Sequence, residues 1–448
     1  MAIKVSKFGG SSLADPAQYQ KVKSIILGDS DRQLIVPSAP GKRHREDIKI
    51  TDLLYLCQAQ VSHRVPFSEI FRIISDRFIQ IARELSIEFD LEKVLEDIRE
   101  KIGSGANLDY VVSRGEYLNG LLLANYLNCR FIDAAEVIRF NKEGAVDPVA
   151  TRLAFQEKMV PGERVVIPGF YGSMPDGSLK IFPRGGSDIS GAVVARAAGA
   201  DIYENWTDVS GFLVTDPQIV PHSRQIHTIT YRELRELSYM GAQVLHEETI
   251  FPVLEAGIPI NIKNTNEPEN PGTMIVSYAD PVSPRGSITG IAGLKDFTVI
   301  AIEKNLMKRE IGFVRRLLTI LEQQQIRFEH MPSGIDSLSL VIRNSELNGK
   351  LEDLIEEIRL QCQPDLLEVY PNMALIATVG HGMAYTPGIS SRLFTALFNA
   401  GVNVRMIDQG SSEINIIVGV ENKDFESAVA AIYHAFFTES APNEKEND

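Results

Sequence analysis

The segment at 7–12, KFGGSS, holds the residues with the clearest chemical potential, and it directly follows the first predicted strand. Its two glycines let backbone amides point at an anion, its serines add hydroxyl donors, and Lys7 supplies a compact positive charge. The pattern is not a Walker A loop, which needs Gly-x-x-x-x-Gly-Lys-Ser/Thr. The alternative interpretation is a tight turn with an exposed lysine. The lysine and serines beside the glycines favour a phosphate site.

A second glycine-rich turn, PRGGSD at 183–188, precedes a predicted helix over 189–198. Helix N-termini favour anions, and Arg184 can hold a carboxylate through two hydrogen bonds while Asp188 can hold an ammonium. Together these groups suit the zwitterionic head of an amino acid. A solvated arginine beside capping residues explains the motif equally well when it is taken alone.

Two further motifs are weaker, SRGEY at 113–117 and WTDVSG at 206–211. A glutamate such as Glu116 in a first helical turn is often only a favourable partner of the helix dipole, and Thr207 and Asp208 suit a turn that closes a strand. The histidines show no metal-ligand spacing. We therefore expect no resident metal, and any metal should arrive with a nucleotide.

Alternating elements must position these motifs. Strands are predicted at 3–8, 33–36, 129–132, 164–167, 202–205 and 260–262, with helices between most of them, including 52–60, 116–127 and one that begins at Thr230. This alternation predicts a mainly parallel sheet covered on both faces, with ligands at the carboxyl ends of its strands. Prolines gather between 268 and 284, where we place a domain boundary. Beyond it one helix-and-strand unit occurs twice, opening at Gly312 and at Gly388.

Composition excludes several classes of protein. A length of 448 residues allows about three domains of about 150 residues. The 45 basic and 59 acidic residues give a net charge of -14, which argues against a nucleic-acid surface. No apolar run approaches the roughly 18 residues of a membrane span, and the N-terminus lacks a signal-peptide core. Three cysteines without short spacing exclude a disulfide framework. We expect a cytoplasmic protein that binds neither nucleic acid nor membranes.

Taken in order, the motifs resemble those of the aspartokinases: KFGGSS at 7–12, SRGE at 113–116, PGF at 168–170, RGGSD at 184–188, and WTDV at 206–209 with TDP at 215–217. The region from Ile291 onward resembles the paired ACT domains that follow their kinase domain. The resemblance implies an α/β protein, a three-layer αβα sandwich with a mainly parallel sheet (the amino acid kinase fold), followed by two ferredoxin-like ACT domains. The implied bounds are 1–285 for the catalytic domain and 286–448 for the regulatory region, with one ACT unit at about 304–372 and the other at about 287–303 plus 373–437. Because the chain ends with the second unit, we expect a monofunctional enzyme.

The family's reaction transfers the γ-phosphoryl group of ATP to the side-chain carboxylate of L-aspartate and gives 4-phospho-L-aspartate, the first step toward lysine, threonine and methionine. A carboxylate nucleophile is already ionised at neutral pH, so the reaction needs no general base. The task is to bring two anions together and to neutralise charge on the moving group. Mg²⁺ is expected with the nucleotide. The alternatives are another amino-acid or nucleotide kinase of this fold and a catalytically inactive amino-acid sensor.

The resemblance also assigns roles to residues. Lys7, Gly9, Gly10 and Asp188 would be catalytic, with Lys7 carrying the positive charge. Arg184 would hold the α-carboxylate of aspartate and Glu116 its ammonium, in a pocket shared with Ser38, Thr51, Gly185 and Ser187. The implied nucleotide set is Lys7, Phe8, Gly9, Gly10, Ser11, Thr207, Asp208, Leu213, Lys263 and Asn264. Relatives often have a tyrosine where this chain has Phe212-Leu213. The loop Lys42-Arg43-His44-Arg45 is unusually basic, and is either a solvated loop or an electropositive gate.

The C-terminal region would sense an end-product amino acid, lysine first with threonine as the alternative, whose binding shifts the kinase to an inactive state. The implied ligand contacts are Met307, Gly312, Phe313, Val314, Ser333, Gly334, Ile335, Asp336 and Ser337. Asp336 or Glu329 would meet a lysine ammonium, whereas threonine would need only head-group contacts. ACT units commonly pair side by side, so we expect a homodimer or a dimer of dimers through these units.

Overall fold

The computed structural model describes residues 2–183, 185–242, 247–277 and 288–438, which form two compact units. The first unit comprises Met1–Phe212, Gln225–Tyr231 and Val244–Val282, and the second comprises Leu213–Arg224, Arg232–Gln243 and Ser283–Asp448. Two segments of the expected catalytic domain, 213–224 and 232–243, therefore cluster with the C-terminal region. No helix in the described ranges is both long enough and apolar enough to cross a membrane.

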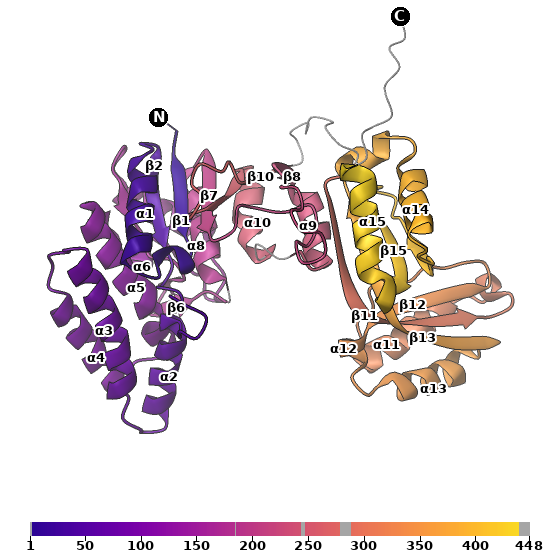
Figure 1. Cartoon of the computed structure of the whole chain (residues 1–448). Helices are drawn as coiled ribbons and strands as arrows, with labels where there is room; N and C mark the ends of the chain where they lie inside the picture. The colour runs from indigo at the N-terminus through magenta and orange to yellow at the C-terminus, as the bar shows by residue number, and fades with distance from the viewer. Residues whose placement is uncertain (1, 184, 243–246, 278–287, 439–448) are drawn as a thin grey trace, which may run out of the picture. The chain divides into compact units, whose positions relative to one another are not determined.

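A sheet of eight strands, counted over the described residues, forms the centre of the first unit (Figure 1). Its order is β3-β4-β2-β1-β7-β9-β10-β8, and among these strands only the pair β9 and β10 is antiparallel. The strands are β1 (Lys4–Phe8), β2 (Arg32–Pro37), β3 (Arg130–Phe131), β4 (Val165–Val166), β7 (Ile202–Thr207), β8 (Thr228–Thr230), β9 (Ile260–Asn264) and β10 (Thr273–Val276). The predicted mainly parallel sheet is confirmed.

Helices cover both faces of this sheet, which completes the predicted three layers. One face, which includes Phe8 and Trp206, packs in a single core with α1 (Pro16–Leu27), α2 (Ile50–Ser62), α3 (Ser68–Glu84), α4 (Leu91–Gly103) and α5 (Leu108–Leu127). On the other face α8 (Gly186–Ala198) contacts β1 and β7, and α7 (Pro148–Lys158) and α10 (Glu247–Ala256) contact α8. Side chains alternate between the two faces of a strand, so Lys7 points to the α8 face and Phe8 away from it.

Local capping decides where the helices begin. The Asn107 side chain accepts a hydrogen bond from the Tyr110 amide at 2.9 Å and starts α5 at Leu108, earlier than the predicted start at residue 116. Gly185 precedes α8 with a φ of +83°, a conformation that glycine adopts without steric cost. Short elements fill the connections: η1 (Ser11–Leu13), α6 (Ala134–Val137) and the hairpin of β5 (Tyr171–Ser173) and β6 (Leu179–Ile181).

The second unit is built on an antiparallel sheet of order β12-β11-β13-β15-β14, as far as the chain is described. Its strands are β11 (Gly290–Glu303), β12 (Ser337–Arg343), β13 (Leu366–Val379), β14 (Met406–Asp408) and β15 (Asn415–Glu421). Its helical segments are α9 (Tyr231–Tyr239, whose first residue belongs to the first unit), η2 (Met307–Arg309), α11 (Phe313–Gln323), α12 (Asn344–Leu347), α13 (Leu351–Cys362), η3 (His381–Tyr385), α14 (Ile389–Asn399), η4 (Asn422–Asp424) and α15 (Phe425–Phe437).

The long strand β11 serves both repeats of this unit. Its first part, Gly290 to Leu294, pairs with the end of β13, and its second part, Phe297 to Glu303, pairs with β12 and the start of β13. Ile300 and Ile302 lie in one core with Phe313 and Leu317 of α11. The expectation placed 287–303 in the second repeat; from Gly290 onward this segment pairs with both ends of β13, and its second part also with β12.

Candidate functional site

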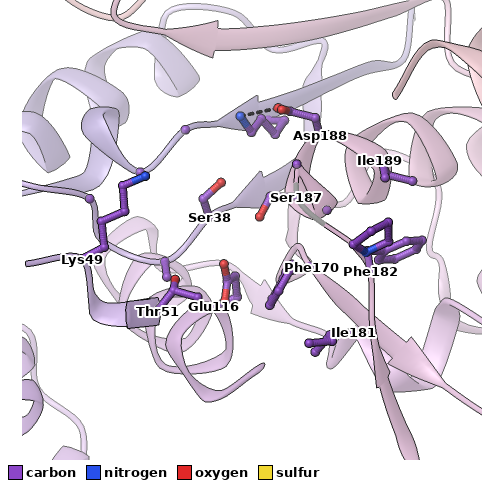
Figure 2. Close-up of a pocket in the computed structure, with 18 of the residues that line it drawn as sticks. Ser38, Lys49, Thr51, Glu116, Phe170, Ile181, Phe182, Ser187, Asp188 and Ile189 are labelled. Carbon is purple, nitrogen blue, oxygen red and sulfur yellow. Dashed lines mark ion pairs between the residues drawn. The ribbon is translucent and has the colours of Figure 1, made fainter. Parts of the chain in front are cut away.

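A pocket of about 1330 Å³ opens where β1, β2 and β7 end (Figure 2). Lys7 and Gly9 come from the end of β1, Ser38 from the loop after β2, and Thr207 from the end of β7. The carboxyl ends of parallel strands lie at one edge of a sheet, where ligands of this fold class bind. The pocket therefore lies where the strand pattern predicts a site.

Lys7 and Asp188 form an ion pair inside this pocket (Figure 2, dashed line). The Lys7 Nζ lies 2.5 Å from Asp188 Oδ1, and Lys7 is only 6% exposed. Asn205, opposite Lys7 in the β1–β7 pairing, accepts from Lys7 Nζ at 3.3 Å and donates to Asp188 Oδ1 at 3.0 Å. These bonds fix a buried cation at the end of β1. Asn205 was not singled out in the sequence because nothing in its own segment marks it.

The glycine-rich loop and the loop after β2 touch through their backbones. The Gly41 amide donates to the Gly10 carbonyl at 2.8 Å. A Cβ on Gly41 would lie 2.5 Å from the Gly10 carbonyl carbon, and a Cβ on Gly10 would lie 2.9 Å from the Ala39 carbonyl oxygen. Only glycine permits this approach, so both positions keep the two loops in contact at the pocket wall.

Glu116 is a buried carboxyl group in the wall of the pocket. It lies on α5, is 4% exposed, and its Oε2 has no hydrogen-bond partner among the described residues. Burial raises the pKa of Glu116 to about 8, because desolvation outweighs the Ala39 amide and the Ser187 hydroxyl that favour the charged form. Figure 2 shows its carboxyl group with the Ser38, Thr51 and Ser187 side chains around one space. A buried carboxyl group with one oxygen left without a partner suits a cationic ligand group.

An apolar wall closes the side of the pocket near α8. Phe170, Ile181 and Phe182 line it (Figure 2). Phe170 has a φ of +76°, which is a strained conformation for a bulky residue. Its amide donates to the buried Ser190 hydroxyl at 2.8 Å, and its carbonyl accepts from the Phe182 amide at 2.8 Å. These bonds hold the strained residue in place at the pocket, where such strain is typically found.

The structure brings most of the predicted site residues to this pocket. Those that line it are Lys7, Gly9, Gly10, Ser11, Ser38, Thr51, Glu116, Gly185, Ser187, Asp188, Thr207 and Asp208. Arg184 lies outside the described residues.

Four residues expected at the nucleotide do not line the pocket. Phe8 stacks on Trp206 on the opposite face of the sheet, with ring centroids 5.9 Å apart. Lys263 lies beside Trp206 in β9, its Nζ 5.1 Å from the Trp206 ring centre, and so also faces away from Lys7. Asn264 is buried and donates to the Ser210 hydroxyl at 3.0 Å. Leu213 belongs to the second compact unit. Lys263 lies on the wrong face because side chains alternate along a strand. The sequence alone does not show how β9 is aligned with β1, so it could not show which face Lys263 would share with Lys7.

Several lining residues were missed by the sequence. Lys49 and Lys180 bring two further cations to the pocket, and Phe140 and Val146 add to its apolar side. Lys49 directly precedes α2 and lies two residues before Thr51. Its closeness in sequence to a predicted site residue could have identified it. The stretch around Phe140 carries no comparable pattern.

The basic loop after β2 divides into two parts. Arg43 is committed to Asp47, with its Nε 2.9 Å from Asp47 Oδ2, whereas Lys42 lines the pocket. The loop is therefore neither wholly solvated nor wholly a gate for anions. In the described ranges no group of three or more His, Cys, Asp or Glu side chains is arranged to hold a metal ion.

In the second unit the segments expected to bind an effector meet at their backbones. The Lys304 amide donates to the Asp336 carbonyl at 2.8 Å, and the Gly334 amide donates to the Ser337 carbonyl at 2.7 Å. Met307 and Phe313 are buried in the core and Gly312 is half-buried, whereas Val314 and Ser333 to Ile335 are exposed. Glu329 accepts from Arg343 Nε at 2.6 Å and from the Tyr239 hydroxyl, so its carboxylate already has partners. Asp336 is the better placed of the two carboxylates considered for a cationic ligand.

Comparisons with protein families and curated proteins agree over nearly the whole chain. A model of the amino acid kinase family matches residues 2–264, and a model of an ACT domain matches residues 376–436. The chain is 38% identical to "Aspartokinase 3" of Bacillus subtilis (strain 168), over 97% of this chain and 99% of that protein.

Solved structures of similar proteins cover both units. The aspartate kinase of Clostridium acetobutylicum shares 57% identity with a TM-score of 0.91, over 97% of this chain and all of that one. Aspartokinase III of E. coli shares 26% identity in two structures. One is in complex with aspartate and ADP (R-state), with a TM-score of 0.69 over 98% of this chain and all of that chain. The other is in complex with lysine and aspartate (T-state), with a TM-score of 0.73 over 97% and 99% of the two chains.

Proposed function

This chain belongs to the amino acid kinase family, and within it to the aspartokinases, and from that premise we propose how its pocket transfers the γ-phosphoryl group of ATP to the side-chain carboxylate of L-aspartate. The observation that carries the proposal is the buried Lys7 and Asp188 pair at the end of β1, beside the glycine-rich loop. Release of ADP that depends on L-aspartate tests the reaction, and its absence with intact, folded protein would contradict it.

The chain's residues perform positioning and charge neutralisation. The aspartate carboxylate is ionised at neutral pH and needs no base. Lys7 lies at the end of β1, where its ammonium neutralises charge that develops on the transferred phosphoryl group. Asp188 and Asn205 keep that ammonium in place before the substrates bind. The two anionic substrates meet in a pocket that also holds the cations Lys42, Lys49 and Lys180.

The nucleotide lies against the glycine-rich loop in this proposal. Gly9, Gly10 and Ser11 offer amides and a hydroxyl to the phosphates, and Thr207 and Asp208 border the same space. Mg²⁺ arrives with ATP, and the carboxylates of Asp188 and Asp208 are oxygen donors of the kind it prefers. When bound, Mg²⁺ neutralises charge on the phosphate oxygens. Phe8, Lys263, Asn264 and Leu213 gain no support from the pocket lining and remain predictions from the family resemblance.

Aspartate lies on the other side of the pocket. Glu116 receives its ammonium, and Ser38, Thr51, Gly185 and Ser187 surround the same space. The family resemblance assigns Arg184 to the α-carboxylate. The aspartate bound in both E. coli structures supports L-aspartate as the ligand of such a site.

Affinity for aspartate should rise with pH up to about 8. The pKa of Glu116 is raised to about 8 in the free protein, so below that pH the group is mostly neutral and must lose its proton to bind an ammonium. The KM for aspartate should therefore fall about tenfold for each pH unit gained between about pH 6 and about pH 8, and then level off. Initial rates across this range, with ATP saturating, measure the dependence. A flat KM would show that Glu116 does not receive the ammonium.

We propose that an end-product amino acid, lysine first, binds the second unit around Met307, Gly312 to Val314 and Ser333 to Ser337. The lysine in the T-state E. coli structure supports this choice of ligand. Ligand binding can affect the kinase through the segments 213–224 and 232–243. They belong to the second unit, but the chain between them contains β8 of the first unit. Glu233 of α9 accepts from the Thr289 hydroxyl at 2.6 Å and from the His381 amide at 2.8 Å, which ties α9 to residues next to the ends of β11 and β13. A coupling free energy of about 1–3 kcal/mol suffices for 5- to 150-fold inhibition.

Asp336→Asn should weaken inhibition by lysine about 3- to 10-fold, because it removes the charge that meets the ligand's side-chain ammonium. Inhibition by threonine should not change. Inhibition curves for both amino acids measure the effect, with the exposed Asp353→Asn on α13 as the control. Equal loss for both ligands, or no inhibition of the wild-type protein by lysine, would refute lysine as the ligand at Asp336.

The remaining assignments are also proposals. The catalytic and regulatory domains take the bounds 1–285 and 286–448, and a homodimer or a dimer of dimers forms through the ACT units. The expected location in the cytoplasm stays a prediction. A catalytically inactive sensor is disfavoured because Lys7, Glu116 and Asp188 are all present and converge on one pocket.

A further inference from the structure

Arg77 is an unusually buried cation in the helical layer. It lies on α3, is 5% exposed, and shares that helix's inner face with Ile74, Phe78 and Ile81. An arginine is rarely so buried unless its charge is paired and its donors are used. The groups that pair with Arg77 therefore need to be identified, unlike those around the exposed arginines of the same helix.

The Arg77 guanidinium connects α3 to two other segments, the turn that ends at Ala14 and the loop after β2. Its Nη1 donates to Asp47 Oδ2 at 2.7 Å, and its Nη2 donates to the carbonyls of Ala14 at 2.8 Å and Gly41 at 2.6 Å. A planar, rigid fork can serve such divergent acceptors, which a lysine ammonium on a flexible stem cannot do equally well. The Nε is buried without a partner among the described residues, so all three hydrogen bonds come from Nη1 and Nη2.

Two of these acceptors lie on the loops that form the pocket, and one of them, Gly41, lines it. Ala14 ends the turn η1 that follows Gly10, and Gly41 lies in the loop after β2 that carries Ser38 and leads to Thr51. The same two loops also meet at the pocket, where the Gly41 amide donates to the Gly10 carbonyl. Arg77 therefore ties the two loops together from outside the pocket.

Asp47 anchors this arrangement. It accepts from the Arg43 amide and Nε, each at 2.9 Å, as well as from Arg77. Hydrogen bonds from Arg43 and from Arg77 hold the pKa of Asp47 well below its usual range. The acceptor for Arg77 is thus ionised throughout the neutral range of pH.

We propose that Arg77 is a positioning residue for phosphoryl transfer, which fixes the glycine-rich loop against the loop after β2 and so sets the spacing of the two substrates. The inference rests on the proposed placement of the ATP phosphates at Gly9 to Ser11 and of aspartate near Ser38 and Thr51. Arg77 does not line that pocket, so it acts through the two loops. A displacement of about 1 Å between reacting groups costs about 10²-fold in rate.

Full-length Arg77→Gln, Arg77→Lys and Arg77→Ala variants test this inference through steady-state kinetics with both substrates. Arg77→Gln should lower kcat/KM for aspartate and for ATP together, by about 10²-fold, and Arg77→Lys by about tenfold. The matched control is Arg72→Gln on the same helix, whose exposed side chain pairs with the exposed Glu69. It should change neither parameter by more than about twofold.

Rescue separates positioning from a general loss of stability. A cavity of about 360 Å³ lined by Arg77, Asp47 and Ile73 adjoins the guanidinium and gives a small cation access to its place. Millimolar guanidinium should restore part of the activity of Arg77→Ala, whereas methylammonium at the same ionic strength should not. Equal restoration of activity by guanidinium and by methylammonium would overturn the role assigned to the planar guanidinium group of Arg77.

The outcomes are distinguishable. Folded Arg77→Gln protein, with wild-type near-UV circular dichroism and both KM values and kcat within about twofold of wild type, would overturn the inference. Where Arg77→Gln does not fold, Asp47→Asn decides: the expected result is a lower kcat/KM for both substrates, and unchanged values would overturn the inference. A wild-type protein without aspartate-dependent release of ADP would instead contradict the proposed function.

Discussion

Replacing Lys7 with alanine should lower kcat about 10²- to 10³-fold. The lysine is the buried cation at the end of β1, and the loss of one such preorganised charge at a transferred group costs rate on this scale. The KM for ATP should change less than kcat, because the amides of the glycine-rich loop remain. The removal also leaves Asp188 without its partner, so an anion would face two anionic substrates.

Initial rates with both substrates saturating measure this loss, and circular dichroism checks that the variant is folded. The matched control is Lys4→Ala, which removes a lysine from the same strand whose Nζ pairs with Asp29 at 2.8 Å. Its kcat should stay within a few-fold of wild type because it lies at the opposite end of β1. A Lys7→Ala variant with near-normal kcat would refute the assigned role.

Glu116→Gln should raise the KM for aspartate about 10- to 100-fold while kcat changes little. The substitution keeps the shape of the side chain but removes the charge that receives the ammonium, and a hydrogen bond to a charged group contributes about 1.5–3 kcal/mol. The substitution has a second and more specific consequence. The KM of the variant should not depend on pH between about pH 6 and about pH 8, because the titrating carboxyl group with a pKa of about 8 has been removed.

Asp109→Asn on the first turn of the same helix, a half-buried residue that does not line the pocket, is the control for this substitution. It should keep both the KM of wild type and its dependence on pH. A Glu116→Gln variant whose KM still fell with rising pH would place the titrating group elsewhere in the pocket.

The sequence predicted the sheet because apolar runs, helical periodicity and glycine-rich turns are local signals. Strand 33–36 and helix 189–198 lie within β2 and α8, and the strand ends carry the expected motifs. Helix starts were less accurate where a cap lies outside the apolar pattern, as Asn107 does for α5. The change of partners along β11 was not predicted, because one long strand gives no local signal of where its partners change.

Contacts between distant segments could not be predicted in the same way. Lys7 and Asp188 are 181 residues apart, and each motif alone allowed a solvated side chain. Lys263 shares a sheet with Lys7 but points to the other face, a difference that depends on strand register. Arg77 gives no sequence signal, because an arginine on an amphipathic helix is usually exposed. Its burial depends on Ala14, Gly41 and Asp47 being brought together by the fold.

Trapping the product with hydroxylamine tests the central claim most directly. An acyl phosphate formed on the aspartate side chain reacts with hydroxylamine to give a coloured hydroxamate. The account predicts that this product forms with the full-length protein only when both ATP and L-aspartate are present, and that Lys7→Ala lowers its rate about 10²-fold or more. No hydroxamate with both substrates present, or the same rate when L-glutamate replaces L-aspartate, would contradict it.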